Sequence, residues 1–318
     1  MQVTVYFATD RVVHGPPDQV GSYTTGILSP TATNLTYGTA FVDGIDLAGN
    51  GQGRITSIQE TAQGTWPPDA SGDLSDPGEN ILLFIHGFDN SFSDAITRAA
   101  FNREWLAASG ATDASTKVIA FSWPSLGAVA GWPIPQEDYL RDQQSARLAG
   151  LHLMTVFSRL EPILTAARAR GHRSFLLTHS MGGLALESAV ENWFAHGNGD
   201  ATLFDVAVLA AADCGYASFS QPNLARLSGL SRLTPRIAVY FSRDDQALLL
   251  SRIINEGAQR LGSDGPKDRA NPTSFPPTIY HMADATAVRD YEYGFLSSHQ
   301  YYRMSPSVRT MIANDISG

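Results

Sequence analysis

The sequence predicts an α/β fold built on a mostly parallel, doubly wound sheet, with helices on both faces and an N-terminal β extension. Two observations carry this prediction. From residue 81 onward, short apolar runs alternate with segments of helical periodicity, the order that produces parallel strands joined by crossover helices. The run Ile-Leu-Leu-Phe-Ile at 81–85 is apolar without interruption, as is typical of a strand that is covered on both faces.

The N-terminal part of the chain predicts the β extension. Residues 1–60 have the pattern of short strands with polar turns, beginning at 3–7, and residues 64–80 form a loop rich in Pro, Gly and Asp. The sequence Gly-Asn-Gly-Gln-Gly at 49–53 predicts a flexible hairpin turn. A phosphate-binding loop is the alternative, but neither the helix nor the Lys-Ser/Thr pair of such a loop follows.

After the first core strand, the remaining elements follow in alternation. Small and apolar residues between Ala95 and Leu106 recur near helical spacing, residues 117–121 form the next strand, and a long helical pattern covers 138–170. We expect Pro162 to break or restart that helix. Later strand patterns lie at 175–177, 204–210, 236–242 and 278–282.

The segment Thr-His-Ser-Met-Gly-Gly at 178–183 is the strongest functional signal. The strand pattern 175–177 leads into it and a helical pattern at 184–190 follows, so Ser180 lies on a sharp strand-to-helix turn. This is the context of a nucleophile elbow, in which small residues flank a strained serine. Thr178 stands where the common pattern has glycine. The alternative is that Ser180 is only the buried N-cap of a helix.

A second motif, His-Gly-Phe-Asp-Asn at 86–90, directly follows the strand at 81–85. Upstream of a serine elbow, a His-Gly pair at the end of a central strand predicts an oxyanion hole, where two backbone N–H groups stabilise one developing negative charge. The donors here are the amides of Phe88 and Met181. The alternative is a core histidine, His86, followed by a tight turn.

A catalytic triad of this type has the chain order serine, acid, histidine. Asp245 follows the strand pattern 236–242, and His299 lies on an expected loop after the candidate last strand at 278–282. We therefore expect Ser180 to attack a carbonyl carbon and His299 to accept and return the proton. Asp245 would orient the imidazole and stabilise its charged form.

Other residues compete for both partner roles. Asp244 is adjacent to Asp245, one of the two is expected to cap the following helix, and Asp213 follows another strand pattern. His281 lies inside a strand pattern and is expected to be structural. The side chain of His179, beside the nucleophile, is expected to point away from it. Surface loops or helices are expected to hold His14, His152, His172 and His196.

Residues 121–139 contain two tryptophans and several prolines at the carboxyl end of a strand. Two interpretations stay open. The segment is either a rigid loop with partly buried rings, or a wall or lid over an acyl pocket. In the second interpretation the substrate pocket includes His86, Trp123 and Trp132.

Together these motifs resemble a bacterial branch of the α/β-hydrolase superfamily, esterase-like serine hydrolases long catalogued as uncharacterised. The resemblance implies an α/β-hydrolase fold, a serine hydrolase without a cofactor, and Asp245 at the acidic position. Gly183 stands where that branch usually carries asparagine or a similar polar residue. Matching segments extend over nearly the whole chain, at 7–11, 84–88, 121–125, 178–182, 242–248 and 299–302.

Composition agrees with such an enzyme and argues against other classes. The 318 residues are 43% hydrophobic, and the formal net charge of −9 argues against nucleic acid as a partner. The single cysteine, Cys214, allows no internal disulfide and no cysteine cluster, so we expect no metal. No apolar run approaches the roughly 20 residues of a membrane span. Because a signal-peptide pattern is absent, we expect a cytoplasmic protein, with a secreted form whose signal has been trimmed as the alternative.

We therefore expect one domain over residues 1–318, with 1–80 as the N-terminal extension and 81–318 as the catalytic core. The expected reaction is hydrolysis of a small-molecule or lipid-like carboxylic ester through an acyl-enzyme. A lipase, an amidase or peptidase, or an acyltransferase would use the same triad. A non-catalytic binding module of this fold is the third alternative.

Overall fold

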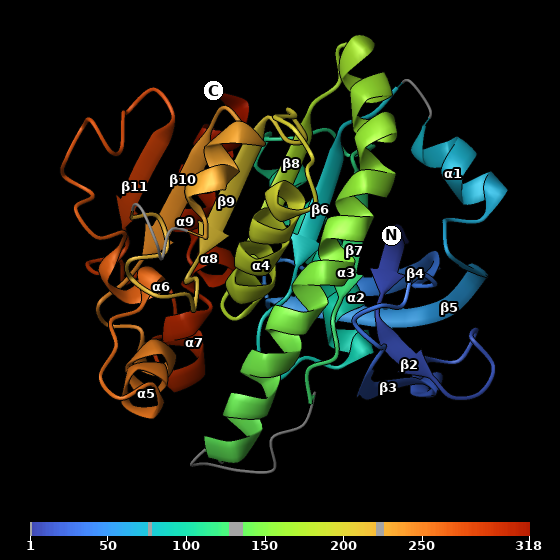
Figure 1. Ribbon diagram of the computed structural model, residues 1–318, viewed down its shortest axis with the longest axis horizontal. Helices are drawn as coiled ribbons and strands as arrows, with labels where there is room; N and C mark the ends of the chain where they lie inside the picture. The colour runs from blue at the N-terminus through green and yellow to red at the C-terminus, as the bar shows by residue number, and fades with distance from the viewer. Residues whose placement is uncertain (1, 76–77, 127–135, 221–225) are drawn as a thin grey trace.

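A central sheet organises the computed structural model, which describes residues 2–75, 78–126, 136–220 and 226–318 (Figure 1). Its strands lie in the spatial order β11-β10-β9-β8-β6-β7-β1-β4-β5, and a separate hairpin pairs β2 with β3. The bounds are β1 (Val3–Thr9), β2 (Arg11–Val13), β3 (Tyr23–Ile27), β4 (Thr36–Asp46), β5 (Gly51–Gln63), β6 (Ile81–Ile85), β7 (Lys117–Ser122), β8 (Ser174–His179), β9 (Val206–Ala210), β10 (Ile237–Phe241) and β11 (Tyr280–Asp284).

The strands from β11 to β1 pair in parallel, and β4 and β5 continue the sheet in antiparallel pairing. The predicted α/β fold with an N-terminal β extension is therefore confirmed. Because β6 lies between β7 and β8, the chain leaves β6 toward one side and returns on the other. Such a switch point opens a crevice at the carboxyl ends of the strands, where α/β proteins bind ligands.

Helices cover both faces of this sheet. Successive side chains of a strand point to opposite faces, so Leu83 of β6 belongs to the core beneath α3 and α4, and Phe84 to the core beneath α2 and α9. Figure 1 shows α3 and α4 in front of the sheet. The helices are α1 (Pro68–Leu74), α2 (Phe92–Ala108), α3 (Gln136–Ala169), α4 (Gly182–Ala195), α5 (Gln246–Ile254), α6 (Leu261–Asp264), α7 (Phe295–His299), α8 (Tyr301–Met304) and α9 (Pro306–Ser317), with short 3-10 turns at Val20–Ser22 and Ser228–Arg232.

Side-chain caps explain where two of the longer helices begin. At the start of α2, Oγ of Ser91 accepts the amide of Asp94 at 3.1 Å, and the Asp94 carboxylate accepts the amide of Ser91 at 2.9 Å. This reciprocal capping box satisfies amides that have no partner inside the helix. At the start of α9, Oγ of Ser305 accepts the amide of Val308 at 3.1 Å, and Pro306 supplies a φ angle suited to the first turn.

The helix that was expected to break at Pro162 is continuous from Gln136 to Ala169, so that prediction is wrong. Pro162 lies on the exposed side of α3. A carbonyl that loses its helical partner there can bond water, and this lowers the penalty of a proline inside a helix. Within the described ranges, no helix is long and apolar enough to cross a membrane.

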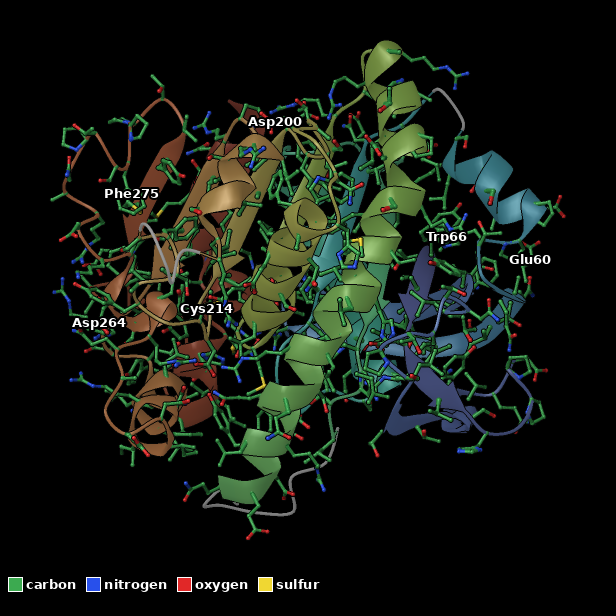
Figure 2. The ribbon with its side chains drawn as sticks, in the orientation of Figure 1. Glu60, Trp66, Asp200, Cys214, Asp264 and Phe275 are labelled. Atoms are coloured by element: carbon green, nitrogen blue, oxygen red, sulfur yellow. The ribbon has the colours of Figure 1, made fainter. Side chains whose placement is uncertain are left out.

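The structure confirms one of three local predictions and corrects the other two. The hairpin turn at 49–53 is confirmed, because Asp46 of β4 pairs with Gly51 of β5. The loop predicted at 64–80 instead contains α1, and Trp66 (Figure 2) anchors it by packing edge-on against Tyr37 with ring centroids 4.7 Å apart. The surface position predicted for His152 is wrong, since this side chain is buried on α3 against the sheet.

Candidate active site

Ser180 lies in the turn between β8 and α4 with a left-handed backbone conformation. Its φ angle is +55°, a value that residues with a side chain rarely adopt. The surrounding bonds hold it there: its N–H donates to the carbonyl of Ala210 at 3.0 Å, and its carbonyl accepts the amides of Gly183 and Asp213 at 2.9 Å each. The strand, turn and helix predicted around this serine are all present.

Two glycines provide the space that the turn requires. A Cβ on Gly182 would lie 2.4 Å from the carbonyl oxygen of His86 and 3.0 Å from Oγ1 of Thr178. Thr178 therefore fits where glycine is usual, because Gly182 has no side chain. A Cβ on Gly183 would lie 2.8 Å from Sγ of Cys214, and α4 proceeds through this position without interruption.

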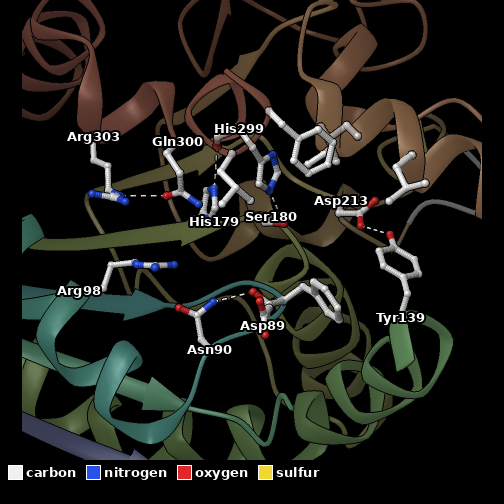
Figure 3. A pocket seen from close by; sticks show the side chains of 16 residues that line it. Asp89, Asn90, Arg98, Tyr139, His179, Ser180, Asp213, His299, Gln300 and Arg303 are labelled. Carbon is white, nitrogen blue, oxygen red and sulfur yellow. Dashed lines mark hydrogen bonds between the residues drawn. The ribbon is translucent and has the colours of Figure 1, made fainter. Parts of the chain in front are cut away.

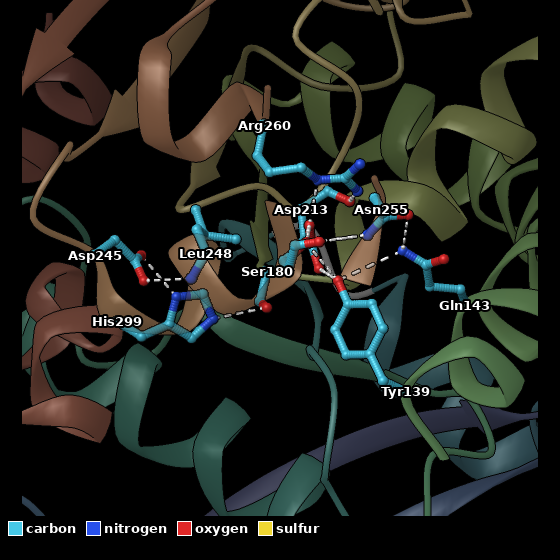
Figure 4. Close-up of polar contacts among 10 residues, drawn as sticks. Tyr139, Gln143, Ser180, Asp213, Asp245, Leu248, Asn255, Arg260 and His299 are labelled. Carbon is cyan, nitrogen blue, oxygen red and sulfur yellow. Dashed lines mark hydrogen bonds and ion pairs between the residues drawn. The ribbon is translucent and has the colours of Figure 1, made fainter. Parts of the chain in front are cut away.

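The structure brings Ser180, His299 and Asp245 into one chain of hydrogen bonds (Figure 4). Oγ of Ser180 lies 2.7 Å from Nε2 of His299, and Nδ1 of His299 lies 2.7 Å from Oδ2 of Asp245. The other carboxylate oxygen of Asp245 accepts the amide of Leu248 at 3.0 Å and so caps α5. His299 ends the short helix α7, where a loop was expected.

The surroundings of His299 favour its charged form despite its burial. Burial alone lowers the pKa of an imidazole, but the charge of Asp245 and its hydrogen bond raise the pKa of His299 above its ordinary value. Asp245 itself is completely buried. An imidazole in such a pair can act as a base that its carboxylate orients and stabilises once charged.

His179 supports the backbone of His299. Its Nε2 donates to the carbonyl oxygen of His299 at 3.0 Å, and the two ring centroids are 4.7 Å apart. Burial, together with repulsion from His299, lowers the pKa of His179 well below its ordinary value, so the ring is neutral with its hydrogen on Nε2. The prediction that this side chain points away from Ser180 is wrong, because it lines the same cavity.

The loop after β6 lies directly against Ser180. A Cβ on Gly87 would lie 2.7 Å from Cβ of Ser180, so only glycine allows this close approach. Phe88 follows in the loop, and Met181 is the N-cap of α4. In the described part of the chain, the amides of Phe88 and Met181 donate to no backbone carbonyl and so remain available to a substrate oxygen.

The peptide between Gly87 and Phe88 is held in one orientation. The carbonyl oxygen of Gly87 accepts Nδ2 of Asn90 at 3.0 Å and Nδ1 of His86 at 2.8 Å. The same Nδ2 donates to the carbonyl of Phe88 at 2.7 Å. In a planar trans peptide, a carbonyl and the following N–H point in opposite directions. Bonds on the Gly87 carbonyl therefore direct the Phe88 amide to the other side of the loop.

Arg11, from the segment 7–11, anchors the loop after β6. Its guanidinium is fully buried, and Nη2 donates to the carbonyl of Asn90 at 2.8 Å while Nε donates to Oγ of Ser122 at 3.0 Å. Nη1 reaches the carbonyls of Thr24 and Ser125 at 3.2 and 3.3 Å. The hydrogen bonds of one buried arginine thus tie the loop after β6 to the end of β7.

His86 and Trp123 lie behind the cavity and do not line it, contrary to the pocket role predicted for them. Their rings are stacked with centroids 5.0 Å apart, and Nε1 of Trp123 donates to the carbonyl of His86 at 2.8 Å. Both side chains are fully buried. Burial, and then the charge of Arg11, lower the pKa of His86 well below its ordinary value. Trp132, the third predicted pocket residue, lies outside the described residues.

Asp213, the competing acid, belongs to a separate buried network (Figure 4). One carboxylate oxygen accepts Nε of Arg260 at 2.7 Å and Oγ of Ser251 at 2.6 Å, and the other accepts the hydroxyl of Tyr139. These bonds link the loop after β9 to α3 and α5. The carboxylate that contacts His299 is thus that of Asp245 and not that of Asp213.

Asp244 and His281, the other candidates for the acid and the base, also have partners outside the Ser180 site. Asp244 is exposed and pairs with Arg289. His281 lies on β11, as its strand pattern predicted, and its Nδ1 is 2.7 Å from Oδ2 of Asp315. Among the residues that the structure describes, no group of three or more His, Cys, Asp or Glu side chains could hold a metal ion.

Ser180 opens into a cavity of about 230 Å³ (Figure 3). Figure 3 shows Tyr139 and Asp213 on one side of the serine and Arg98 and Arg303 on the other. Apolar side chains complete the wall: Phe88, Ala247, Leu248, Leu250, Phe295 and Leu296.

Sequence reasoning missed several residues of this site. Asn90 ends the quoted motif 86–90, and its place beside an expected oxyanion loop is a signal that could have found it. Arg303 follows His299 closely, but nothing in the local pattern separates it from the other arginines of the chain. Arg98 belongs to an amphipathic helix, where a solvated position is the ordinary expectation.

The chain is similar to a known protein family and to several solved structures. Residues 69–315 match the model of a protein family described as Alpha/beta hydrolase of unknown function (DUF900). No curated protein matches. Among solved structures, the chain is similar to an esterase from Pyrobaculum calidifontis, with 13% identity over 97% of this chain and 86% of that one and a TM-score of 0.37. It is also similar to carboxyl esterase 2 from the fungus Tuber melanosporum (9% identity, 92% and 87% covered, TM-score 0.40) and to a Trichoderma reesei cutinase in complex with a phosphonate inhibitor (15%, 67% and 85%, TM-score 0.31).

Proposed function

The chain belongs to this family of alpha/beta hydrolases, and we propose that it is a serine esterase that cleaves small carboxylic esters through Ser180, His299 and Asp245. One observation carries the proposal: an unbroken chain of hydrogen bonds joins Oγ of Ser180, the imidazole of His299 and the carboxylate of Asp245, with 2.7 Å at each contact. Such a chain couples a nucleophile, a general base and an orienting acid, which are the groups that acyl transfer needs.

The first half of the reaction forms an acyl-enzyme. Oγ of Ser180 bonds to the ester carbonyl carbon while its proton passes to Nε2 of His299. The carbon–oxygen bond to the alcohol then breaks, and His299 returns the proton to the departing alcohol oxygen. Asp245 stabilises the imidazolium between these steps, in keeping with the raised pKa of His299.

The developing oxyanion needs donors that are oriented before the reaction begins. The amides of Phe88 and Met181 are proposed for this role. The bonds that Asn90 and His86 make to the Gly87 carbonyl support it, because they orient the peptide that carries the Phe88 amide. Such preorganised donors lower the barrier without reorganising during the reaction.

The second half of the reaction releases the acid. A water molecule gives a proton to Nε2 of His299 and attacks the acyl carbon, and the same two amides stabilise the second tetrahedral intermediate. Its collapse breaks the bond to Oγ of Ser180, and His299 returns the proton to the serine. The net reaction consumes one ester and one water and yields one acid and one alcohol.

The size of the cavity supports a small acyl group. The cavity has a volume of about 230 Å³ and is partly open to solvent, whereas pockets for drug-sized ligands are about 300–1,000 Å³. The apolar wall that includes Phe88 and Leu248 suits a short acyl chain. Long-chain lipids are less well matched to a space of this size.

A panel of p-nitrophenyl esters from acetate to octanoate, with a fluorophosphonate probe, tests the proposal. We expect turnover that is highest for short chains and covalent labelling that peptide mapping assigns to Ser180. Labelling without ester turnover would indicate a different serine chemistry. Neither turnover nor labelling would indicate a non-catalytic protein and would overturn the proposal.

A further inference from the structure

We propose that the ester substrate carries an anionic group, a carboxylate or a phosphate, and that Arg98 and Arg303 bind this group beside the nucleophile. The inference rests on the proposed esterase function, because it names the substrate class of the same cavity. It goes further because it assigns a charge to the substrate, a property that Ser180, His299 and Asp245 do not define.

Both arginines line the cavity that contains Ser180 and His299. Arg98 comes from α2 and Arg303 from α8, so two elements far apart in the sequence bring positive charge to one end of the cavity. Figure 3 shows Gln300 and His179 near them, whereas Tyr139 and Asp213 are at the other end. A substrate that spans the serine would place one part against this basic end.

The hydrogen-bond donors of Arg303 are incompletely satisfied. This side chain is only 9% exposed, and its Nε donates to Oε1 of Gln300 at 2.9 Å. Nη1 is buried, and no described residue offers it an acceptor. A buried donor without a partner is costly in free energy, so such groups in native proteins call for an explanation.

Arg98 also brings N–H donors to this cavity that no protein acceptor uses in the described part of the chain. Its Nε donates to Oε1 of Gln52 at 3.3 Å, and in the described part of the chain its two Nη groups have no acceptor. No carboxylate forms an ion pair with Arg98 or Arg303 among the residues that the structure describes. Asp89 also lines the cavity, on the loop after β6.

Arg260 provides an internal comparison. It is buried to a similar extent, at 5% exposure, but its Nε contacts the carboxylate of Asp213 at 2.7 Å. For Arg303, burial lowers the pKa to about 10, and repulsion from Arg98 acts in the same direction. Arg303 nevertheless remains charged at neutral pH. Although the net charge of the chain is −9, no carboxylate of the described residues pairs with this buried cation.

The chemistry of the guanidinium group defines the ligand. Its planar fork of N–H donors matches the oxygens of a carboxylate or a phosphate, and bonds between such charged groups are stronger than those between neutral groups. An anion bound here would give the buried Nη1 of Arg303 an acceptor and could also accept from the Nη groups of the partly buried Arg98. A cavity of about 230 Å³ suits a small molecule that carries both the anion and the ester.

Matched pairs of esters test the inference and distinguish the two sources of charge. The first pair is mono-4-nitrophenyl succinate and 4-nitrophenyl butyrate, which differ in a carboxylate on the acyl part. The second pair is the acetate ester of glycerol 3-phosphate and that of glycerol, followed by acid release. Each is assayed with the wild-type enzyme, Arg98→Gln and Arg303→Gln, and with Arg159→Gln, an exposed arginine on α3, as the control for net charge.

We expect the wild-type enzyme to favour the charged member of at least one pair in kcat/KM. A preference in the first pair assigns the anion to an acyl carboxylate, and a preference in the second assigns it to a phosphate on the alcohol. In Arg98→Gln and Arg303→Gln, the loss with that charged ester should exceed the loss with its neutral partner by roughly ten- to hundredfold. Arg159→Gln should retain the preference of the wild-type enzyme.

Calorimetric titration with succinate and with inorganic phosphate tests the site without turnover. Binding to the wild-type protein that is lost in Arg98→Gln supports the inference, even if Arg303→Gln fails to fold. Ser180-dependent hydrolysis of neutral esters without any preference for charge, and without anion binding, would overturn the anion site while leaving the esterase intact. Anion binding without labelling of Ser180 would instead retain the site and overturn the esterase.

Discussion

Nε2 of His179 donates a hydrogen bond to the backbone carbonyl of His299 at 3.0 Å, so the residue before the proposed nucleophile supports the residue that is proposed as its base. His179 ends β8 and Ser180 follows it in the turn, whereas His299 comes from α7. The position of the imidazole relative to the serine is therefore held by a backbone contact as well as by the bond between their side chains.

Replacement of the proposed nucleophile should remove ester hydrolysis. In Ser180→Ala we expect a loss of several orders of magnitude in kcat with the fold retained, because one oxygen atom is removed from a packed turn. Steady-state kinetics and circular dichroism measure the two effects. Ser158→Ala, at an exposed serine of α3, is the control. Activity at the wild-type level in Ser180→Ala would contradict the triad assignment.

The pH dependence of kcat/KM should report the protonation of His299. A raised pKa means that the imidazole stays protonated to a higher pH, and a protonated imidazole cannot accept the serine proton. Activity should therefore fall as the pH drops through a pKa above about 6.5, the ordinary value for histidine. His299→Ala should be inactive, whereas His281→Ala should keep both the activity and the profile. The opposite pattern would show that the wrong histidine was chosen.

Removing the charge of the proposed acid should affect rate and pH profile together. Asp245→Asn should lower kcat by roughly 10⁴-fold, because the imidazole loses its orientation and its counter-charge. The midpoint of the residual profile should move to lower pH, since the charge that raises the pKa of His299 is gone. Asp244→Asn, at an exposed position, should change neither quantity strongly.

Asp213→Asn separates a structural acid from a catalytic one. This substitution leaves the buried Arg260 without its carboxylate, which we expect to cost about 3–5 kcal/mol of unfolding free energy. The pH midpoint of the remaining activity should fall less than in Asp245→Asn, because the charge of Asp213 raises the pKa of His299 less than that of Asp245 does. Thermal denaturation and a pH–rate profile measure the two effects. A larger shift of the midpoint in Asp213→Asn than in Asp245→Asn would reverse the assignment.

Gly87 should not tolerate a side chain. In Gly87→Ala the new Cβ would lie 2.7 Å from Cβ of Ser180, so the loop or the nucleophile must move and kcat should fall at least tenfold. Gly72→Ala, on α1, is the matched control because a Cβ there meets nothing within 4 Å. Equal activities in the two variants would contradict the close approach of this loop to the serine.

Asn90 should influence rate more than substrate binding. Asn90→Ala removes a bond to the Gly87 carbonyl and frees the peptide that carries the Phe88 amide. We expect kcat to fall roughly tenfold or more, below the 10²- to 10³-fold loss of an entire oxyanion donor, with little change in KM. Asn192→Ala, on α4, is the control. A change confined to KM would mean that Asn90 contacts substrate and does not position the donor.

Much of the fold follows from local patterns in the sequence. Uninterrupted apolar runs such as 81–85 form strands because both faces of the sheet are covered, and β6 occupies that run. Pro162 and the loop at 64–80 were misjudged for a shared reason. The cost of a proline, or of a loop rich in glycine and proline, depends on which side faces water and on what packs against it, and Trp66 supplies that packing for α1.

By itself, the sequence indicated the turn around Ser180, because the strand pattern, the small residues and the helical pattern that mark it lie within a few positions of each other. Bonds to Ala210 and Asp213, which follow in the next strand and loop, hold that turn in the folded protein. It also narrowed the acid to three aspartates, since a triad has a fixed order along the chain. Only the tertiary structure decided among them, by bringing Asp245 within 2.7 Å of His299 although 54 positions separate them. The register of the strands and the direction of each side chain set such distances. The same reason explains why His86 and Trp123 face the interior while Arg98 and Arg303, from distant helices, meet beside the nucleophile.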